Sequence, residues 1–248
     1  NLLKLQLFIY SSYNQFSIMV IFHCYRVYMK LNVIITGVTG MVGEGVLHEC
    51  LLDERVESVL SISRNPSGIK HSKLKEIIHN DFMDISAIES KLQQFNACFF
   101  CMGVSSLGKS EEEYYNLTFN LTSNFAKTLS TLNPLMTFCY VSGAGTDSTE
   151  QGKYMWARVK GKTENYLFTL PYKQVFAFRP AYIKPIKGLK NTLRLYKGYP
   201  LIYPVIKLLF PNYVSTLTDI AKSMITCTLQ GYNKNILEVK DINKIAKL

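Results

Sequence analysis

Three glycines stand three residues apart in the segment Thr36-Gly37-Val38-Thr39-Gly40-Met41-Val42-Gly43, directly after a short apolar run. Between a strand and a helix, this spacing allows a tight turn, a close approach of the backbone to phosphate, and close packing of the helix on the strand. The first amides of that helix would then face the phosphates. The pattern predicts a dinucleotide-binding turn, with the pyrophosphate held by Gly37, Thr39, Gly40, Met41, Val42 and Gly43.

The end of the next predicted strand indicates which dinucleotide is bound. An acidic residue at this place would bind the ribose hydroxyls of NAD. This chain has Ser63-Arg64 instead. Because a guanidinium can pair with a 2′-phosphate, Arg64 favours NADP over NAD, and an exposed turn arginine without a ligand is the alternative.

The cysteines and histidines favour packing over metal or redox chemistry. The six cysteines, at positions 24, 50, 98, 101, 139 and 227, lie mostly within apolar runs. Cys98 and Cys101 match C-x-x-C, but residues three apart in a strand point to opposite faces. His48 and His79 are isolated in the sequence. We therefore expect no metal site, and the cysteine usage predicts a reducing, cytoplasmic location.

Strand-like and helix-like stretches alternate around these residues. Strands are predicted at 31–36, 56–63, 74–79, 97–102, 136–141 and 174–178, and helices at 41–52, from Asp84 to Leu92, from a capping box at Ser110 and Glu113 to Leu132, and at 153–170. Strands separated by helices require crossover connections, hence a parallel sheet covered on both faces. The sequence predicts a doubly wound α/β fold of the Rossmann type.

The pattern changes after residue 180. Prolines and aromatic residues accompany two helical stretches, roughly 190–210 and 215–230. We expect a small C-terminal helical segment on the substrate side of the fold. The apolar run from Tyr199 to Phe210 is interrupted by Pro200 and Pro204, which favours core or lid packing over membrane contact.

Composition agrees with a soluble globular chain. Of the 248 residues, 48% are hydrophobic and 19% are charged, without low-complexity tracts. The net charge of +10 comes from scattered lysines rather than a basic stripe, so no nucleic-acid partner is expected.

The first 28 residues differ from the rest of the chain. They carry only Lys4 and Arg26 as charges, and polar residues interrupt the uncharged run from Leu5 to Tyr25. We expect residues 1–28 to be an N-terminal extension outside the fold, upstream of a natural start at Met29, with a membrane anchor as the alternative. Residues 29–248 are then expected to form a single NAD(P)-binding domain.

The pattern Thr-Gly-x-Thr-Gly-x-x-Gly resembles that of the short-chain dehydrogenase/reductase superfamily, in its extended or atypical branch. This branch includes NAD-dependent epimerase/dehydratases and Tat-interacting-protein-like reductases. Three later segments are also similar to the family, over about residues 29–185 in order: Asp81-Phe82, Cys101-Met102-Gly103 and Phe178-Arg179-Pro180. The resemblance implies that Asp81 and Phe82 contact the adenine, that Cys101, Met102 and Gly103 line the cofactor, and that Pro180 lies near the nicotinamide.

Catalysis in this superfamily uses a Tyr-x-x-x-Lys pair one helical turn apart, in which the lysine lowers the tyrosine pKa and binds ribose. By resemblance the lysine is Lys160, and Trp156 then stands at the tyrosine position. An indole has one N–H donor and no titratable oxygen, so it cannot replace the phenol. Tyr154 can serve only if the helix begins after it and the chain folds back.

The family serine is Ser142 in one alignment register and is replaced by Gly143 in the next. Two function classes therefore remain open. The first is an NADP-dependent oxidoreductase or epimerase that acts on an unknown carbonyl or alcohol, with Lys160, Ser142 and Tyr154 or water at the catalytic position. The second is a nucleotide-binding sensor or interaction protein, in which Ser142 only ends a strand and Lys160 only binds ribose.

Overall fold

The computed structural model describes residues 30–191 and 203–248 of the chain. The expected N-terminal extension and the first part of the predicted helical segment at 190–210 lie outside these residues. The compact unit considered below spans Leu31–Leu248.

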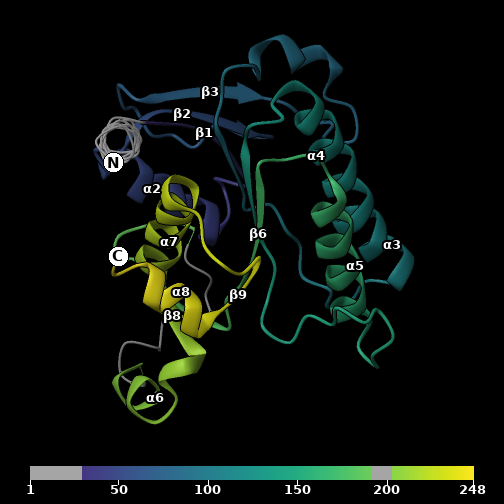
Figure 1. Ribbon diagram of the computed structural model, residues 1–248, viewed down its shortest axis with the longest axis vertical. Coiled ribbons are helices and arrows are strands. Elements are labelled where there is room, and N and C mark those ends of the chain that lie inside the picture. Colours follow the sequence, from purple (N-terminus) through teal and green to yellow (C-terminus); the bar gives the residue numbers. More distant parts are fainter. Residues whose placement is uncertain (1–29, 192–202) are drawn as a thin grey trace, which may run out of the picture. The chain divides into compact units, whose positions relative to one another are not determined.

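The centre of this unit is a sheet of seven parallel strands in the order β3-β2-β1-β4-β5-β6-β9 (Figure 1). The strands are β1 (Leu31–Thr36), β2 (Val56–Ser63), β3 (Leu74–Ile78), β4 (Ala97–Phe100), β5 (Thr137–Val141), β6 (Gln174–Arg179) and β9 (Ile236–Glu238). The first six have the order of the doubly wound dinucleotide-binding fold, so the predicted fold class is confirmed. A separate parallel pair is formed by β7 (Tyr182–Lys184) and β8 (Val214–Thr216).

Helices cover both faces of the sheet (Figure 1). One face carries α2 (Met41–Leu52), α7 (Leu217–Gln230) and α8 (Val239–Ile245), and the other carries α3 (Glu111–Tyr115), α4 (Leu121–Leu132) and α5 (Met155–Thr169). The shorter helix α6 (Tyr203–Leu209) precedes a 3-10 turn η5 (Pro211–Tyr213). Because strand side chains alternate, Ile35 packs into the cluster under α2 while its neighbour Ile34 packs into the cluster under α4.

Two helices and one capping box differ from their prediction. The helix expected after Asp84 is a 3-10 turn, η1 (Ser86–Lys91). The helix expected from 110 to 132 contains a π-helical turn, η2 (Asn116–Asn120), between α3 and α4. Ser110 accepts a hydrogen bond from the backbone N–H of Glu113 as predicted, but the Glu113 carboxylate pairs with Lys109 at 2.7 Å.

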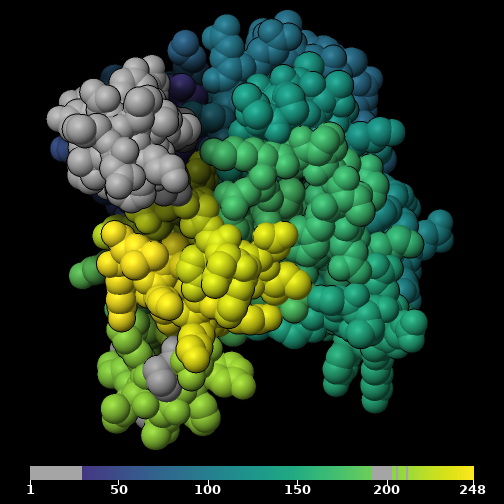
Figure 2. Space-filling model, viewed as in Figure 1, coloured from purple at the N-terminus to yellow at the C-terminus, as the bar shows by residue number. Residues whose placement is uncertain are grey.

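The C-terminal segment is not only helical as expected, because it also contains β7, β8 and β9. Strand β9 pairs with β6 and extends the main sheet. Figure 2 shows the C-terminal residues (yellow) against the green residues from the middle of the chain. Each of these strands has three residues, too few to show an alternating pattern. No helix within the described residues has the length and apolar character needed to cross a membrane.

Candidate dinucleotide and active site

The glycine turn joins β1 to α2 and lies against the end of β4. Gly37 has φ of +74°, and a Cβ atom there would come within 2.8 Å of the backbone of Cys101 and Met102. A Cβ on Gly43 would overlap the Gly37 carbonyl oxygen. Gly40 caps α2 without a side-chain hydrogen bond, so the first amides of the helix stay available to an anion.

A cavity of about 210 Å³ opens at this point, where the order of strands reverses. Among the residues that line it, eight were predicted to bind the cofactor, namely Gly37, Thr39, Gly40, Arg64, Phe82, Cys101, Met102 and Gly103. Met41, Val42 and Gly43 form the first turn of α2, and the side chains of Met41 and Val42 pack on the core. The arrangement fits a dinucleotide whose pyrophosphate lies over the glycine turn.

Asp81 and Phe82 follow β3 beside this cavity. Phe82 is buried and packs on Phe125 with ring centroids 6.0 Å apart. The carboxylate of Asp81 accepts the backbone N–H of Met83 at 2.9 Å, and His79 bonds the Asp81 carbonyl oxygen through Nε2. These contacts fix the turn that would meet the adenine.

Ser142 lies just beyond β5, at the same end of the sheet as the glycine turn. Its hydroxyl is 3.0 Å from that of Thr146, and the Thr146 hydroxyl donates to the Gly143 carbonyl oxygen at 2.7 Å. Because Thr146 has only one hydroxyl hydrogen, Ser142 must be the donor between the two. The Ser142 oxygen is therefore left as an acceptor. Sequence reasoning did not find Thr146, whose role depends on the loop geometry.

Lys160 projects from α5 over the same face of β5. Its Nζ lies 5.4 Å from the centroid of the buried Tyr140 ring, and Tyr140 and Ser142 share a strand face because they are two residues apart. Burial lowers the pKa of Lys160 to about 8, although the nearby Glu164 carboxylate opposes the shift. The residue as a whole is half-buried. Lys160 therefore combines access with a pKa near neutrality.

Trp156 and Tyr154 stand at the start of α5. The helix begins at Met155, so Trp156 is one helical turn from Lys160, and its indole lies against Gly145. Tyr154 is the N-cap residue with extended backbone, and 62% of it is exposed. The helix thus begins after Tyr154, as a catalytic role for that residue would require. The carbonyl oxygen of Pro180, just after β6, accepts the N–H of Ala144 in the loop between β5 and α5 at 2.9 Å.

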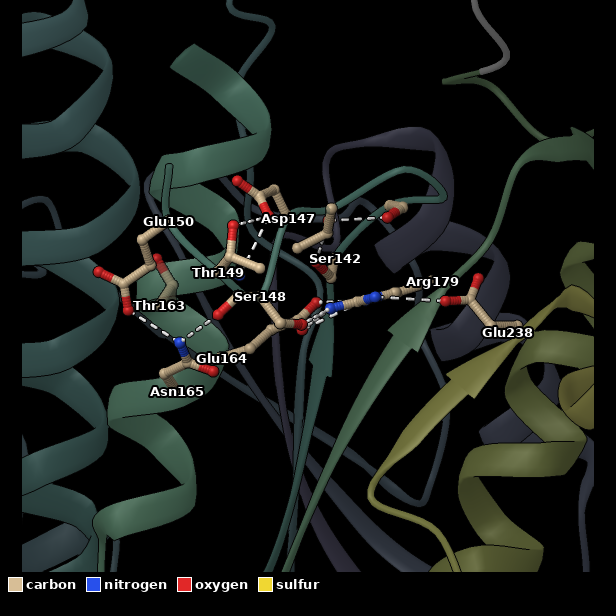
Figure 3. A network of polar contacts seen from close by, with 12 residues as sticks. Ser142, Asp147, Ser148, Thr149, Glu150, Thr163, Glu164, Asn165, Arg179 and Glu238 are labelled. Carbon is tan, nitrogen blue, oxygen red and sulfur yellow. Dashed lines mark hydrogen bonds and ion pairs between the residues drawn. The ribbon is translucent and has the colours of Figure 1, made fainter. Parts of the chain in front are cut away.

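The loop between β5 and α5 is held by a buried ionic network that the sequence did not reveal (Figure 3). Arg179, at the end of β6, donates to the fully buried Glu164 carboxylate from both Nε and Nη2. Its Nη2 also donates to the Ser148 hydroxyl at 2.6 Å, and Nη1 pairs with Glu238 at 3.3 Å. One guanidinium thereby joins β6, α5, the loop and β9.

A second set of contacts shapes the same loop (Figure 3). The Asp147 carboxylate accepts the backbone N–H of Gly152 at 2.6 Å and the hydroxyl of Thr149 at 2.7 Å. Asn165 donates to the Glu150 carboxylate at 2.8 Å. A Cβ on Gly161 would overlap the Asp147 carbonyl oxygen, so the loop lies directly on α5. The loop is fixed close to Lys160.

Comparison with known families indicates which nucleotide-binding proteins of this fold the chain resembles. Residues 33–153 match the model of the NAD dependent epimerase/dehydratase family. These residues are therefore similar to the NAD-dependent epimerase/dehydratase family. The resemblance proposed from the glycine turn is thereby confirmed, and with it an NAD-binding fold of the short-chain dehydrogenase/reductase type.

Two relatives have names that place them in mitochondria. The protein FMP52, mitochondrial, of Meyerozyma guilliermondii is 23% identical over 88% of this chain and 96% of its own length. The protein FMP52-1, mitochondrial, of Scheffersomyces stipitis is 22% identical over 66% of this chain and 74% of its own length. Both names conflict with the predicted cytoplasmic location, and that prediction is wrong. Cysteines in apolar runs indicate buried, reduced thiols. They do not show in which compartment of the cell the protein works.

Solved structures of other proteins share this fold. The Bordetella bronchiseptica enzyme WbmF in complex with NAD+ has a TM-score of 0.61 at 14% identity, over 88% of this chain and 77% of that one. The dTDP-glucose 4,6-dehydratase DesIV of Streptomyces venezuelae, with NAD bound, has a TM-score of 0.61 at 13% identity, over 87% and 80%. At such identities the likeness concerns the fold alone.

Proposed function

We propose that this chain binds NADP and works as an oxidoreductase on a carbonyl or alcohol group of a small molecule, with Lys160 as its proton-transferring residue. The observation that carries the proposal is the position of Lys160. Its ammonium group lies over Tyr140, two residues before Ser142 on the chain, and the residue is one helical turn from the indole that stands where the family has its tyrosine. A bound nicotinamide would supply the hydride acceptor or donor.

The cofactor half of the proposal is supported by the glycine turn and its cavity. The close approach at Gly37 and the uncapped start of α2 leave room and backbone donors for a pyrophosphate. Arg64 is exposed on the cavity rim at the end of β2, where a 2′-phosphate would lie. Phe82 and the Cys101–Gly103 loop would border the adenosine and the dinucleotide bridge.

The chemical half of the proposal is supported by the environment of Lys160. Burial brings its pKa to about 8, a value from which a lysine can both donate and accept a proton near neutral pH. In the ammonium form Lys160 can protonate a substrate oxygen, and in the amine form it can accept the proton of an alcohol. Solvent then restores the proton that is lost or gained, because the residue is only half-buried.

Ser142 would orient the substrate. With its hydrogen directed to Thr146, the Ser142 oxygen accepts a hydrogen bond from a substrate hydroxyl. A carbonyl substrate offers no such hydrogen, and its oxygen would instead face the Lys160 ammonium. Tyr154, the exposed N-cap residue of α5, is the second candidate for the proton donor.

A nucleotide sensor without turnover is the second candidate function. It is favoured by Trp156, which brings no titratable oxygen to the family's tyrosine position, and by the Ser142 hydroxyl, whose hydrogen is already used. In that case the bound nucleotide would stabilise the loop between β5 and α5 and control contacts of the protein surface.

Turnover of NADPH with a panel of aldehydes and ketones tests the proposal. We expect oxidation of NADPH with at least one compound, a loss of about 10²–10⁴-fold in Lys160→Met, and little change in Tyr154→Phe. Loss of activity in Tyr154→Phe alone would transfer the proton step to that phenol. No turnover in the native protein, together with activity in Trp156→Tyr, would favour the sensor.

Nucleotide binding can be tested independently of turnover. Trp156 is the only tryptophan of the chain, and it lies at the start of α5. We expect NADPH to change its fluorescence and to raise the melting temperature of the protein. If neither NADPH nor NADH changes either signal, the cofactor assignment is wrong.

A further inference from the structure

We propose that Lys190 is the second cation of a 2′-phosphate site and, with Arg64, determines the preference for NADP. This inference rests on the proposed function, because it assumes that a dinucleotide lies over the glycine turn. It adds a residue from a distant segment, 126 positions beyond Arg64 in the sequence. No motif of the glycine turn includes this segment.

The position of Lys190 is set by Glu44. This glutamate lies in the first turn of α2, directly after the glycine turn, and is 5% exposed. Its carboxylate accepts the backbone N–H of Lys190 at 2.8 Å and that of Asn191 at 2.7 Å. A buried carboxylate with two backbone donors is a strong anchor, since both bonds are charge-assisted. Glu44 therefore holds the backbone of Lys190 beside the cofactor helix.

The side chain of Lys190 extends to the turn that follows β2. Its Nζ lies 3.6 Å from the place where a Cβ of Gly68 would stand. Gly68 has φ of +74° and no side chain, so the turn leaves space for the ammonium group. The same turn begins at Arg64, which lines the cofactor cavity. Two cations from separate segments thus lie along the loop that follows β2, Arg64 at its start and Lys190 beside Gly68.

The other groups of this turn suit a phosphate. The hydroxyl oxygen of Ser67 accepts the backbone N–H of Ile69 at 3.1 Å, which leaves its hydrogen free to donate. The Glu76 carboxylate, at the same turn, holds the Ser67 backbone N–H at 2.9 Å. Within the described part of the chain, no ion pair involves Arg64 or Lys190. The carboxylates at this site, Glu44 and Glu76, accept backbone N–H groups, whereas the two cations are left for a ligand.

This geometry assigns the two cations different tasks. Arg64 offers a planar fork that can pair with a phosphate through two N–H groups, whereas Lys190 offers a mobile point charge. A ribose without the 2′-phosphate gains little from either. The preference for NADP should therefore depend on both residues, while binding of the shared pyrophosphate should depend on neither.

Affinities for NADPH and NADH, measured by titration of the purified protein, test the inference. We expect Lys190→Gln to weaken NADPH about tenfold, as the loss of one charge-assisted contact implies, and to leave NADH unchanged. Arg64→Gln should act in the same way. The matched control is Lys187→Gln, an exposed lysine of the same segment, which should change neither affinity.

Three results would overturn the assignment of Lys190. Equal weakening of NADPH and NADH in Lys190→Gln would mean that the residue supports the pyrophosphate or the fold. Unchanged affinities would mean that it contacts no nucleotide. Equal affinity of the native protein for both nucleotides would refute the 2′-phosphate site while leaving dinucleotide binding intact. Failure to bind either nucleotide would also refute the proposed function.

Discussion

One side chain, Lys160, carries most of the chemistry proposed for this protein. Its ammonium group lies over the Tyr140 ring, in surroundings that favour the neutral amine over the charged form. In a family pair of tyrosine and lysine, the lysine modifies the tyrosine. Here the neighbour one turn away is an indole, so the lysine itself is the titratable group.

The pH dependence of turnover follows from this shift. Carbonyl reduction needs the ammonium form, so we expect its rate to be constant at lower pH and to fall as pH rises through about 8. Alcohol oxidation needs the amine form, so its rate should rise through the same value. Steady-state rates in both directions, measured between pH 6 and pH 10, check this expectation. A parallel pH dependence in both directions would contradict it.

The pH dependence of the free energy of unfolding provides a second test of the lowered pKa of Lys160. The pKa of Lys160 is about 8 when folded and close to 10.5 when unfolded, so the unfolded chain binds more protons between these values. Stability of the native protein should therefore rise with pH across this window. Lys160→Met lacks the effect, and its stability relative to the native protein should be highest below pH 8 and then decline.

Local patterns explain which site residues could be predicted from the sequence. The glycine turn and Arg64 are recognisable because a strand, a turn and a helix follow one another within the motif. Thr146 and Glu44 have partners that depend on how loops return to the sheet. Lys190 lies far from its neighbours in sequence, and no local spacing indicates it.

At the scale of elements, the start of α5 and the preceding loop form one unit. Gly161 allows the loop to lie directly on the helix, at Asp147. A glycine within a helix normally costs about 1 kcal/mol relative to alanine. Its presence here is explained by contact rather than by helix propensity.

Replacing a helical glycine by alanine usually stabilises a protein, and at Gly161 we expect the opposite effect. We expect Gly161→Ala to destabilise the protein by about 1–3 kcal/mol, because the new methyl group must displace a backbone carbonyl. It should also reduce turnover by shifting the loop that contains Ser142. Urea unfolding and NADPH oxidation measure the two effects. Gly143→Ala is the matched control for stability, since no atom lies within 4 Å of the new Cβ; a stabilising effect of Gly161→Ala would contradict the expectation.

The elements themselves were largely predictable for a physical reason. Strand β1 and helix α2 were expected at 31–36 and 41–52, and the structure has them there. Each of these elements buries one face or both, so the spacing of its hydrophobic residues indicates whether it is a strand or a helix. The 3-10 turn η1 and the π-helical turn η2 have periods close to that of an α-helix, and the pattern does not separate them.

At the scale of the whole molecule, Arg179 at the end of β6 links elements on both sides of that strand. It connects the loop and α5 on one side with Glu238 of β9 on the other. Glu164 is fully buried, so its charge depends on the guanidinium for compensation.

Removing the guanidinium should therefore be costly. We expect Arg179→Met to lower the free energy of unfolding by about 3–5 kcal/mol, because Glu164 would be left buried without its partner. The double variant Arg179→Met/Glu164→Leu should recover much of this loss. The control is Lys109→Met in the exposed pair with Glu113, which should cost below about 1 kcal/mol. A similar small cost for Arg179→Met, measured by urea unfolding, would contradict the expectation.

The close packing of α2 on α7 limits how this protein could be recombined with its relatives. A Cβ on Gly45 would lie 2.7 Å from the side chain of Leu217, although residues 33–153 alone match the family model. The C-terminal helices are thus not an exchangeable module. A chimera that takes its C-terminal part from another family member should fold only if residue 45 and the residue facing it come from the same parent.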